Sequence, residues 1–251
     1  SFGSGKTLLL KRTSFRTGGE LVINGLSDLL IGAYGSGDKP SLVNNDGTKV
    51  LCIGGGAKNI TIRDISMSTA NYPGTSAQAG IRLYEYPAGA IGGSDNVSIL
   101  NCEIKNVESG IVAVPGNASN LTIAWNHIHH VEVEGIYLKG NKGTNIIHAC
   151  YIHDVNEKYY ENQNETVSSG DNIQLDETEN AVVSNCLIDR SNAGNKFCLI
   201  PGSSGLSIEI RNNYFIAYPG RPAIFWIGYT GICEGNTFRG GAHGFWGFSG
   251  T

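Results

Sequence analysis

The sequence predicts an all-β protein, a right-handed parallel β-helix of about eight rungs, and three observations lead to this prediction. Short segments recur along the chain, each segment alternates apolar and polar residues, and a helical pattern is missing. Glycine accounts for 35 of 251 residues, charged residues are 16%, and no stretch sustains a 3.6-residue period. The backbone freedom of glycine suits the many tight turns of a coil made of short strands.

The repeat consists of two alternating segments. The first reads Asn-Val-Ser-Ile-Leu-Asn-Cys-Glu-Ile at 96–104 and returns, with substitutions, at 120–128, 144–152 and 180–188. The second, Gly-Ile-x-Leu, begins at Gly80 and Gly135 and returns as Asn-Ile-Gln-Leu from Asn172. The interval is about 24 residues, lengthened by insertions, which is typical of solenoid turns whose strands bury one face only after stacking. Neither a leucine-rich repeat nor a propeller blade matches this period.

One position of the repeat holds only a few residue types, namely Ile65, Cys102, Asn126, Cys150, Cys186, Asn213 and Asn236. Stacked parallel strands lie about 4.8 Å apart, so an asparagine here is expected to bond the backbone amide of the next rung. Cysteine fills the same space as a compact apolar residue. We therefore expect buried thiols without an extended disulfide framework, although one Cys150–Cys186 bridge stays open. A metal or redox site at that pair is the less favoured alternative.

A further cysteine, Cys233, replaces isoleucine in an inward column of the repeat and is expected in the core. The chain 1–251 is interpreted as a single β-helix domain, part of a longer chain with both ends uncapped. The net charge of −4 argues against a nucleic-acid partner, which usually needs a basic face. No run of 18 apolar residues occurs, so no membrane span is expected.

Between about residues 21 and 238, the repeats resemble the pectate-lyase-like superfamily of right-handed β-helices. That group includes polysaccharide lyases, uronan epimerases, glycoside hydrolases and non-catalytic surface proteins. The resemblance implies a secreted or cell-surface protein whose partner is an acidic polysaccharide or oligosaccharide. A fold that supports so many activities does not select one of them.

Alignment of the repeats places ionisable side chains in outward columns on one side of the middle rungs. One column holds Lys105, His129, His153 and Asp189, and the next holds Asn106, His130, Asp154 and Arg190. Asp171 and Lys196 are expected to be neighbours on successive rungs, either as a functional pair or as a salt bridge between two corners. Since a uronan lyase must neutralise a carboxylate and remove the proton beside it, the candidate catalytic residues are Asp171, Lys196, Lys139 and His153.

The segment Glu132-Val-Glu-Gly-Ile-Tyr-Leu-Lys139 resembles the Glu-x-Glu…Lys stretch of alginate and chondroitin lyases of polysaccharide lyase family six. By that resemblance, Glu132 and Glu134 ligate calcium and Lys139 is the base. Those enzymes place an arginine on the next rung beside the lysine, where this chain has Asp176.

Ca²⁺ is the possible cofactor, because it takes oxygen ligands of the kind that this face offers. The candidate ligands are Glu132, Glu134, Asp171 and Asp176. The His129/His153/Asp189 column suggests a transition-metal site, but stacking at about 4.8 Å favours a polar corner there. Candidate substrate-binding residues are polar or aromatic side chains on the same face and in the long insertion after residue 155: Arg82, Tyr84, Tyr137, Gln174, Tyr159, Tyr160 and Arg190.

The leading functional hypothesis is a secreted enzyme that cleaves a uronate-containing polysaccharide by proton abstraction and β-elimination. The alternatives are a glycoside hydrolase or uronan epimerase on the same fold, and a non-catalytic β-helix that binds glycan or builds a cell-surface structure.

Overall fold

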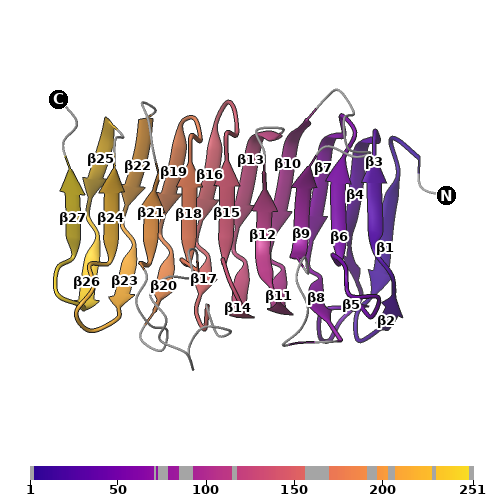
Figure 1. The fold of residues 1–251 in the computed structure, drawn as a ribbon. Coiled ribbons are helices and arrows are strands. Elements are labelled where there is room, and N and C mark those ends of the chain that lie inside the picture. Colours follow the sequence, from indigo (N-terminus) through magenta and orange to yellow (C-terminus); the bar gives the residue numbers. More distant parts are fainter. Residues whose placement is uncertain are drawn as a thin grey trace.

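A computed structural model describes residues 3–70, 72, 79–84, 93–114, 118–155, 170–190, 197–202, 207–227 and 230–248 (Figure 1). Within these ranges every strand pairs with its neighbours in parallel, and the chain advances along one axis from indigo to yellow. No helix occurs in the described residues, so none there is long and apolar enough to cross a membrane. The predicted right-handed parallel β-helix is confirmed.

Three sheets form the sides of the coil, and each contains nine strands in the described part of the chain. Sheet A comprises β1 (Thr7–Lys11), β4 (Ser27–Tyr34), β7 (Lys58–Arg63), β10 (Ser94–Leu100), β13 (Ala118–Ala124), β16 (Asn145–His148), β19 (Ala181–Ser184), β22 (Ser207–Arg211) and β25 (Thr230–Glu234). Sheet B comprises β2 (Phe15–Gly18), β5 (Ser41–Asn44), β8 (Ser66–Thr69), β11 (Glu103–Val107), β14 (His127–Val131), β17 (Tyr151–Ile152), β20 (Leu187–Asp189), β23 (Tyr214–Ala217) and β26 (Thr237–Gly240). Sheet C comprises β3 (Leu21–Asn24), β6 (Leu51–Gly54), β9 (Ala79–Tyr84), β12 (Ser109–Ala113), β15 (Ile136–Lys139), β18 (Ile173–Asp176), β21 (Leu199–Pro201), β24 (Ile224–Ile227) and β27 (Phe245–Phe248).

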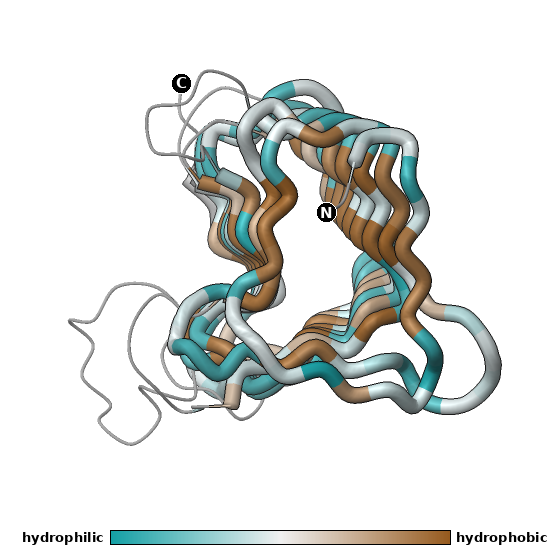
Figure 2. Tube along the Cα trace, turned by 90° about the vertical axis from the view of Figure 1, so that its right-hand side faces the viewer, coloured by the Kyte–Doolittle hydropathy of each residue, from teal (hydrophilic) through white to brown (hydrophobic). Residues whose placement is uncertain are grey.

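The interior of the coil is lined by stacked aliphatic side chains. Viewed along the axis, successive coils superpose, and hydrophobic residues recur at matching places on the sides of the coil (Figure 2). The register explains this, since Ile62, Ile99 and Ile123 are consecutive partners on sheet A and all are buried. Period-2 alternation sends every second side chain inward, and stacking closes the core.

The predicted corner column is a hydrogen-bond ladder. Asn126 Oδ1 accepts from the Cys102 amide at 2.8 Å, and its Nδ2 donates to the Ile99 carbonyl at 2.8 Å. Asn213 Oδ1 accepts from the Cys186 amide at 2.9 Å in the same way. Each asparagine therefore satisfies backbone groups of the rung before it, rather than those of the next rung as predicted, where the strand bends and the sheet pattern is interrupted. Both side chains are almost fully buried.

The glycine that opens the Gly-Ile-x-Leu segment is required by close backbone approach. A Cβ at Gly110 would overlap the carbonyl oxygen of Gly135, and a Cβ at Gly135 would overlap that of Asn172. These positions stack on one another at the entry to sheet C. Because glycine has no side chain, the backbones of consecutive coils can approach closely here and pair as the strands of sheet C, which carry the candidate site.

One core prediction is wrong, because Cys233 is exposed. It does occupy the expected inward column, opposite Ile210 on β22. However, β25 is last in the order of sheet A, so its side chains are covered by a neighbouring strand on one side only. The other five cysteines are buried, and all six are free thiols.

Thiol labelling should separate the cysteines sharply. We expect rapid modification of Cys233 in the native protein and of all six cysteines after denaturation. Burial raises the pKa of Cys52 to about 12 and that of Cys102 to about 11, which suppresses the reactive thiolate in addition to blocking access. Mass spectrometry of labelled peptides is the measurement. Rapid native labelling of Cys102, Cys150 or Cys186 would contradict the ladder.

Candidate functional site

Two polar faces meet at one corner of the coil, on the outer sides of sheets B and C. On sheet C the exposed positions alternate with buried residues, so Tyr137 and Lys139 of β15 project outward on either side of Leu138. Gln174 and Asp176 of β18 do the same around Leu175. We call the outward polar residues of this sheet the sheet C strip: Arg82, Tyr84, Tyr137, Lys139, Gln174 and Asp176.

The strip is organised around the Asp176 carboxylate. β15 and β18 pair with Tyr137 opposite Gln174 and Lys139 opposite Asp176. The Tyr137 hydroxyl donates to Asp176 Oδ2 at 2.9 Å, and Gln174 Nε2 donates to the same oxygen at 2.9 Å. A side chain at Gly202 on the next rung would overlap Asp176 Oδ1, so glycine leaves that space to the carboxylate. The structure thus brings together four residues that the sequence predicted for the site.

Tyr137 keeps its proton in this setting. Partial burial, the hydrogen bond to Asp176 and the negative charge of Asp176 raise the pKa of Tyr137 well above its ordinary value. The carboxylates of Glu134 and Glu177 act in the same direction. A phenol whose anion is disfavoured in this way remains a proton donor at neutral pH.

Positive charge on the same face comes from Lys139 and Arg82. Val112 of β12 is the register partner of both Arg82 and Tyr137, which places those two residues two rungs apart in one outward column. The guanidinium carbon of Arg82 lies 5.6 Å from the centroid of the Tyr84 ring, within cation–π range. Arg82 is therefore positioned by an aromatic neighbour of the same strip.

Aromatic side chains lie on the rungs of the coil that follow the sheet C strip. The rings of Phe197 and Phe225 are stacked with centroids 4.8 Å apart, and Phe225 meets Trp246 edge-on at 5.6 Å. Phe225 lies between the buried Ile224 and Trp226, and its register partner Trp246 is exposed. Exposed aromatic faces of this kind suit the apolar faces of sugar rings.

The corner between the two faces is buried. Asp171 and Arg190 are each only 2% exposed. Asp171 Oδ1 accepts from the Phe197 amide at 2.7 Å, and Arg190 Nη1 donates to Asn172 Oδ1 at 3.0 Å. Burial lowers the pKa of Arg190, while the negative charge of Asp171 opposes that effect. Two opposite charges therefore act on each other inside the corner.

The prediction that Arg190 lies in an outward column, where it would bind substrate, is wrong. β20 ends at Asp189, so the strand alternation that placed Arg190 outside no longer applies at the next residue. The guanidinium instead enters the corner beside Asn172. Three other predicted residues, Lys196, Tyr159 and Tyr160, lie outside the described residues, so the expected Asp171–Lys196 pair stays a prediction.

The four predicted calcium ligands are each drawn into local contacts. Glu134 Oε2 accepts from Ser109 Oγ at 3.1 Å, Asp171 bonds the Phe197 amide, and Asp176 bonds Tyr137 and Gln174. Glu132 is almost fully buried. Across the ranges that the structure describes, no three of these carboxylates converge as metal ligands do. The described residues form no preformed calcium site with these four side chains, and calcium binding stays a prediction.

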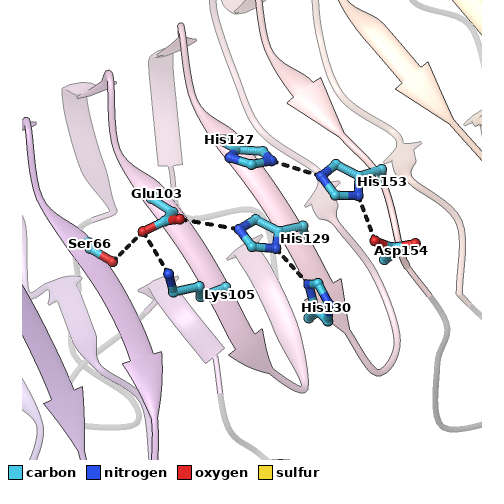
Figure 3. Close-up of polar contacts among 8 residues, drawn as sticks. All are labelled: Ser66, Glu103, Lys105, His127, His129, His130, His153 and Asp154. Atoms are coloured by element: carbon cyan, nitrogen blue, oxygen red, sulfur yellow. Dashed lines mark hydrogen bonds and ion pairs between the residues drawn. The ribbon is translucent and has the colours of Figure 1, made fainter.

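Sheet B carries a second group, which we call the histidine cluster: His127, His129 and His153 (Figure 3). His127 and His129 project from β14 on either side of the buried Ile128, and His153 follows the aligned Ile152 on the next rung. His127 Nε2 and His153 Nε2 are 2.7 Å apart. His153 Nδ1 lies 2.7 Å from Asp154 Oδ2. The side chains thus converge more closely than the spacing of their strands.

Glu103 borders the cluster as a fixed negative charge. Its carboxylate accepts from Ser66 Oγ at 2.7 Å, pairs with Lys105 Nζ at 3.0 Å, and faces His129 Nε2 at 3.4 Å (Figure 3). Burial opposes ionisation, but the hydrogen bonds from Ser66 and Lys105 and the charge of Lys105 prevail and lower the pKa of Glu103 to about 2. Glu103 is therefore ionised throughout the physiological range.

Two of the cluster's rings, His127 and His129, are held neutral. Burial, followed by repulsion from His127, lowers the pKa of His129 to about 4, and burial also lowers the pKa of His127. The contacts are satisfied when His153 donates from Nδ1 to Asp154 and accepts at Nε2 from His127 Nε2.

A groove of about 500 Å³ opens beside the histidine cluster; its lining is Asp38, Lys39, Ser41, Ser66, Glu103, Lys105 and His127. The sequence predicted His129 and His153 in one outward column but did not predict His127 or Glu103 as part of the group. Alternation around Ile128 and Ile104 marks both as outward, so that signal was present in the sequence. The sequence contained no signal for the convergence of side chains from different rungs.

Comparisons with known proteins agree with the fold. The model for "Right handed beta helix region" matches residues 38–159. Among curated proteins, no sequence match was found. Similar solved structures include an alginate lyase from Paenibacillus sp. str. FPU-7, with a TM-score of 0.61, 14% identity, and coverage of 96% of this chain and 91% of that chain.

Two further structures are less similar. The GH136 lacto-N-biosidase from Eubacterium ramulus has a TM-score of 0.59 and 12% identity over 95% of this chain and 62% of that chain. The enzymatically active domain of tailspike protein 2 of bacteriophage CBA120 has a TM-score of 0.53 and 14% identity over 97% and 39%. This chain thus spans less than two thirds of either protein. At sequence identities this low, the structural similarity establishes only the fold, a right-handed parallel β-helix. Similarity to polysaccharide lyase family six is not confirmed.

Proposed function

We propose that this protein is a secreted or cell-surface enzyme that binds an acidic polysaccharide along the sheet C strip and cleaves it by β-elimination. The observation that carries the proposal is the hydrogen bond from Tyr137 to Asp176, with Lys139 opposite Asp176 in the same strand pair. A proton donor, a carboxylate and an amine are thereby assembled on one outer face. The fold that this chain shares with an alginate lyase supports the same class of reaction.

Each group has a place in the elimination. Arg82 is positioned to balance the uronate carboxylate, which acidifies the adjacent C–H bond. Lys139 takes that proton, and the electron pair of the C–H bond becomes the new C=C bond. The C–O bond to the leaving sugar breaks, and Tyr137 donates its proton to the departing oxygen. Asp176 orients the hydroxyl of Tyr137 through the 2.9 Å hydrogen bond.

Hydrolysis is the second candidate, because carboxylates gather around the same tyrosine. Asp176 bonds Tyr137, and the charges of Glu134 and Glu177 also act on it. A glycosidase needs two carboxylic groups flanking the scissile bond, one as acid and one as base or nucleophile. The two candidates share the strip and differ in the product.

A panel of uronans distinguishes these reactions. We expect polymannuronate, polyguluronate, polygalacturonate or chondroitin to give products with rising ultraviolet absorbance, because elimination creates a conjugated C=C bond. New reducing ends without a rise in ultraviolet absorbance would contradict elimination and show hydrolysis instead. Altered uronate stereochemistry without cleavage would indicate epimerisation. Binding without any of these changes would contradict an enzymatic function and favour a glycan-binding β-helix.

A further inference from the structure

We infer that the histidine cluster on sheet B is a binding site for a divalent transition-metal ion, best fitted by zinc, with His127, His129 and His153 as ligands. One ring nitrogen of each residue lies within 4.8 Å of those of the other two. Among the described residues no other trio of His, Cys, Asp or Glu converges in this way. The site lies on a different sheet from Tyr137 and Lys139 and does not depend on the proposed cleavage reaction.

Two rungs supply the three ligands. His127 and His129 are two residues apart on one outer face of β14, and His153 stands next to them after β17. Backbone spacing of about 4.8 Å would leave a loose set. The imidazoles lean together instead, so that His127 Nε2 and His153 Nε2 approach to 2.7 Å. Strand β14 fixes the Cα positions of His127 and His129, and the hydrogen bond from the His153 amide to the Ile128 carbonyl at 3.1 Å fixes that of His153, which preorganises the set.

Outer hydrogen bonds orient two of the rings for ligation. The 2.7 Å contact between His153 Nδ1 and Asp154 Oδ2 leaves Nε2 of His153 with its lone pair toward the cluster. His129 is held on its Nδ1 side by His130 Nδ1 at 2.6 Å. A carboxylate on the far nitrogen of a ligating histidine is the usual companion of zinc, because it fixes the tautomer and strengthens the donor.

The donor set selects the class of ion. Imidazole nitrogen suits zinc and its neighbours in the transition series, whereas calcium and magnesium take oxygen ligands. Tetrahedral zinc with Zn–N bonds of about 2.0–2.1 Å requires nitrogens roughly 3.3 Å apart. The observed 2.7 Å pair must therefore open slightly and the wider pairs must close, which rotation of the side chains can supply.

Three protein ligands leave a fourth position open. The groove lined by Ser66, Glu103, Lys105 and His127 reaches the cluster from one side. Glu103 Oε1 lies 3.4 Å from His129 Nε2, so its carboxylate is a further group that could approach the ion. Water or an oxygen of a polar ligand in the groove would complete the coordination, as in zinc sites with an open position.

The rival explanation is a hydrogen-bonded imidazole network that binds no metal. Titration of tag-free, chelator-treated protein with ZnCl₂ by calorimetry tests the two explanations, with CoCl₂ absorbance as a second readout. We expect one zinc per chain and the visible d–d bands of tetrahedral Co²⁺. Absence of saturable binding would overturn the site and leave the network.

Variants locate the ion. His153→Ala and His127→Ala should each weaken zinc binding by more than the roughly 10- to 100-fold expected for Asp154→Asn, which removes only an outer partner. His148→Ala on sheet A is the matched control, since His148 bonds Ser184 and lies outside the cluster. Equal loss in the control would show adventitious binding and contradict the site. Circular dichroism of each metal-free variant verifies folding. His153→Gln replaces His153→Ala if the alanine variant fails to fold.

Discussion

Replacing Lys139 by alanine should reduce turnover of the uronate substrate by about 100- to 10,000-fold, the usual contribution of one acid or base group. Tyr137→Phe should cause a loss of similar size, because it removes the proton donor and keeps the ring. Both side chains are only partly buried, so the melting temperature should change little. Initial rates on the uronan that the wild-type protein cleaves provide the measurement.

Matched controls separate chemistry from general damage. Lys58→Ala removes an exposed lysine from sheet A, and Tyr214→Phe removes an exposed hydroxyl from sheet B. Both controls should retain wild-type rates. Full activity in Lys139→Ala and Tyr137→Phe would show that the strip is not the catalytic centre, whereas a loss shared with the controls would show that the effect is not local.

The buried corner should give the largest effect on stability. Arg190→Met is expected to lower the free energy of unfolding by about 3–5 kcal/mol, because it removes the positive charge that acts on the buried Asp171. Urea denaturation of wild type and variant measures the difference. Arg239→Met, at an exposed position of sheet B, is the matched control and should change stability by less than about 0.5 kcal/mol.

A double variant tests whether the two charges are coupled. Asp171→Asn in the Arg190→Met background should cost less than the sum of the two single changes, because no isolated charge then remains. Strict additivity, or an Arg190→Met variant as stable as its control, would mean that the corner does not rely on this pair.

The fold could be predicted because each turn of a solenoid repeats the same pattern of apolar, polar and corner residues. The aligned position of Asn126 and Cys102 predicted the corner ladder, and strand alternation predicted that Tyr137 and Gln174 lie on the same outer face. Both inferences use only the repeat interval and strand alternation. They hold wherever the chain is extended.

Prediction failed where the chain leaves the strand or where side chains bend across rungs. Arg190 follows the end of β20, and alternation says nothing about a residue that turns into a corner. The approach of His127 to His153 depends on χ angles and on contacts with Asp154. Those are set by packing between coils, which the repeat pattern does not encode.

Mass spectrometry of the cleaved polysaccharide tests the central claim most directly. If the sheet C strip performs elimination, each new non-reducing end carries an unsaturated uronate and is lighter by one water than a hydrolysis product. Wild-type protein should yield these ends, and Lys139→Ala should not. Products that retain the full water, or no cleavage of any uronan by wild-type protein, would contradict the proposed lyase.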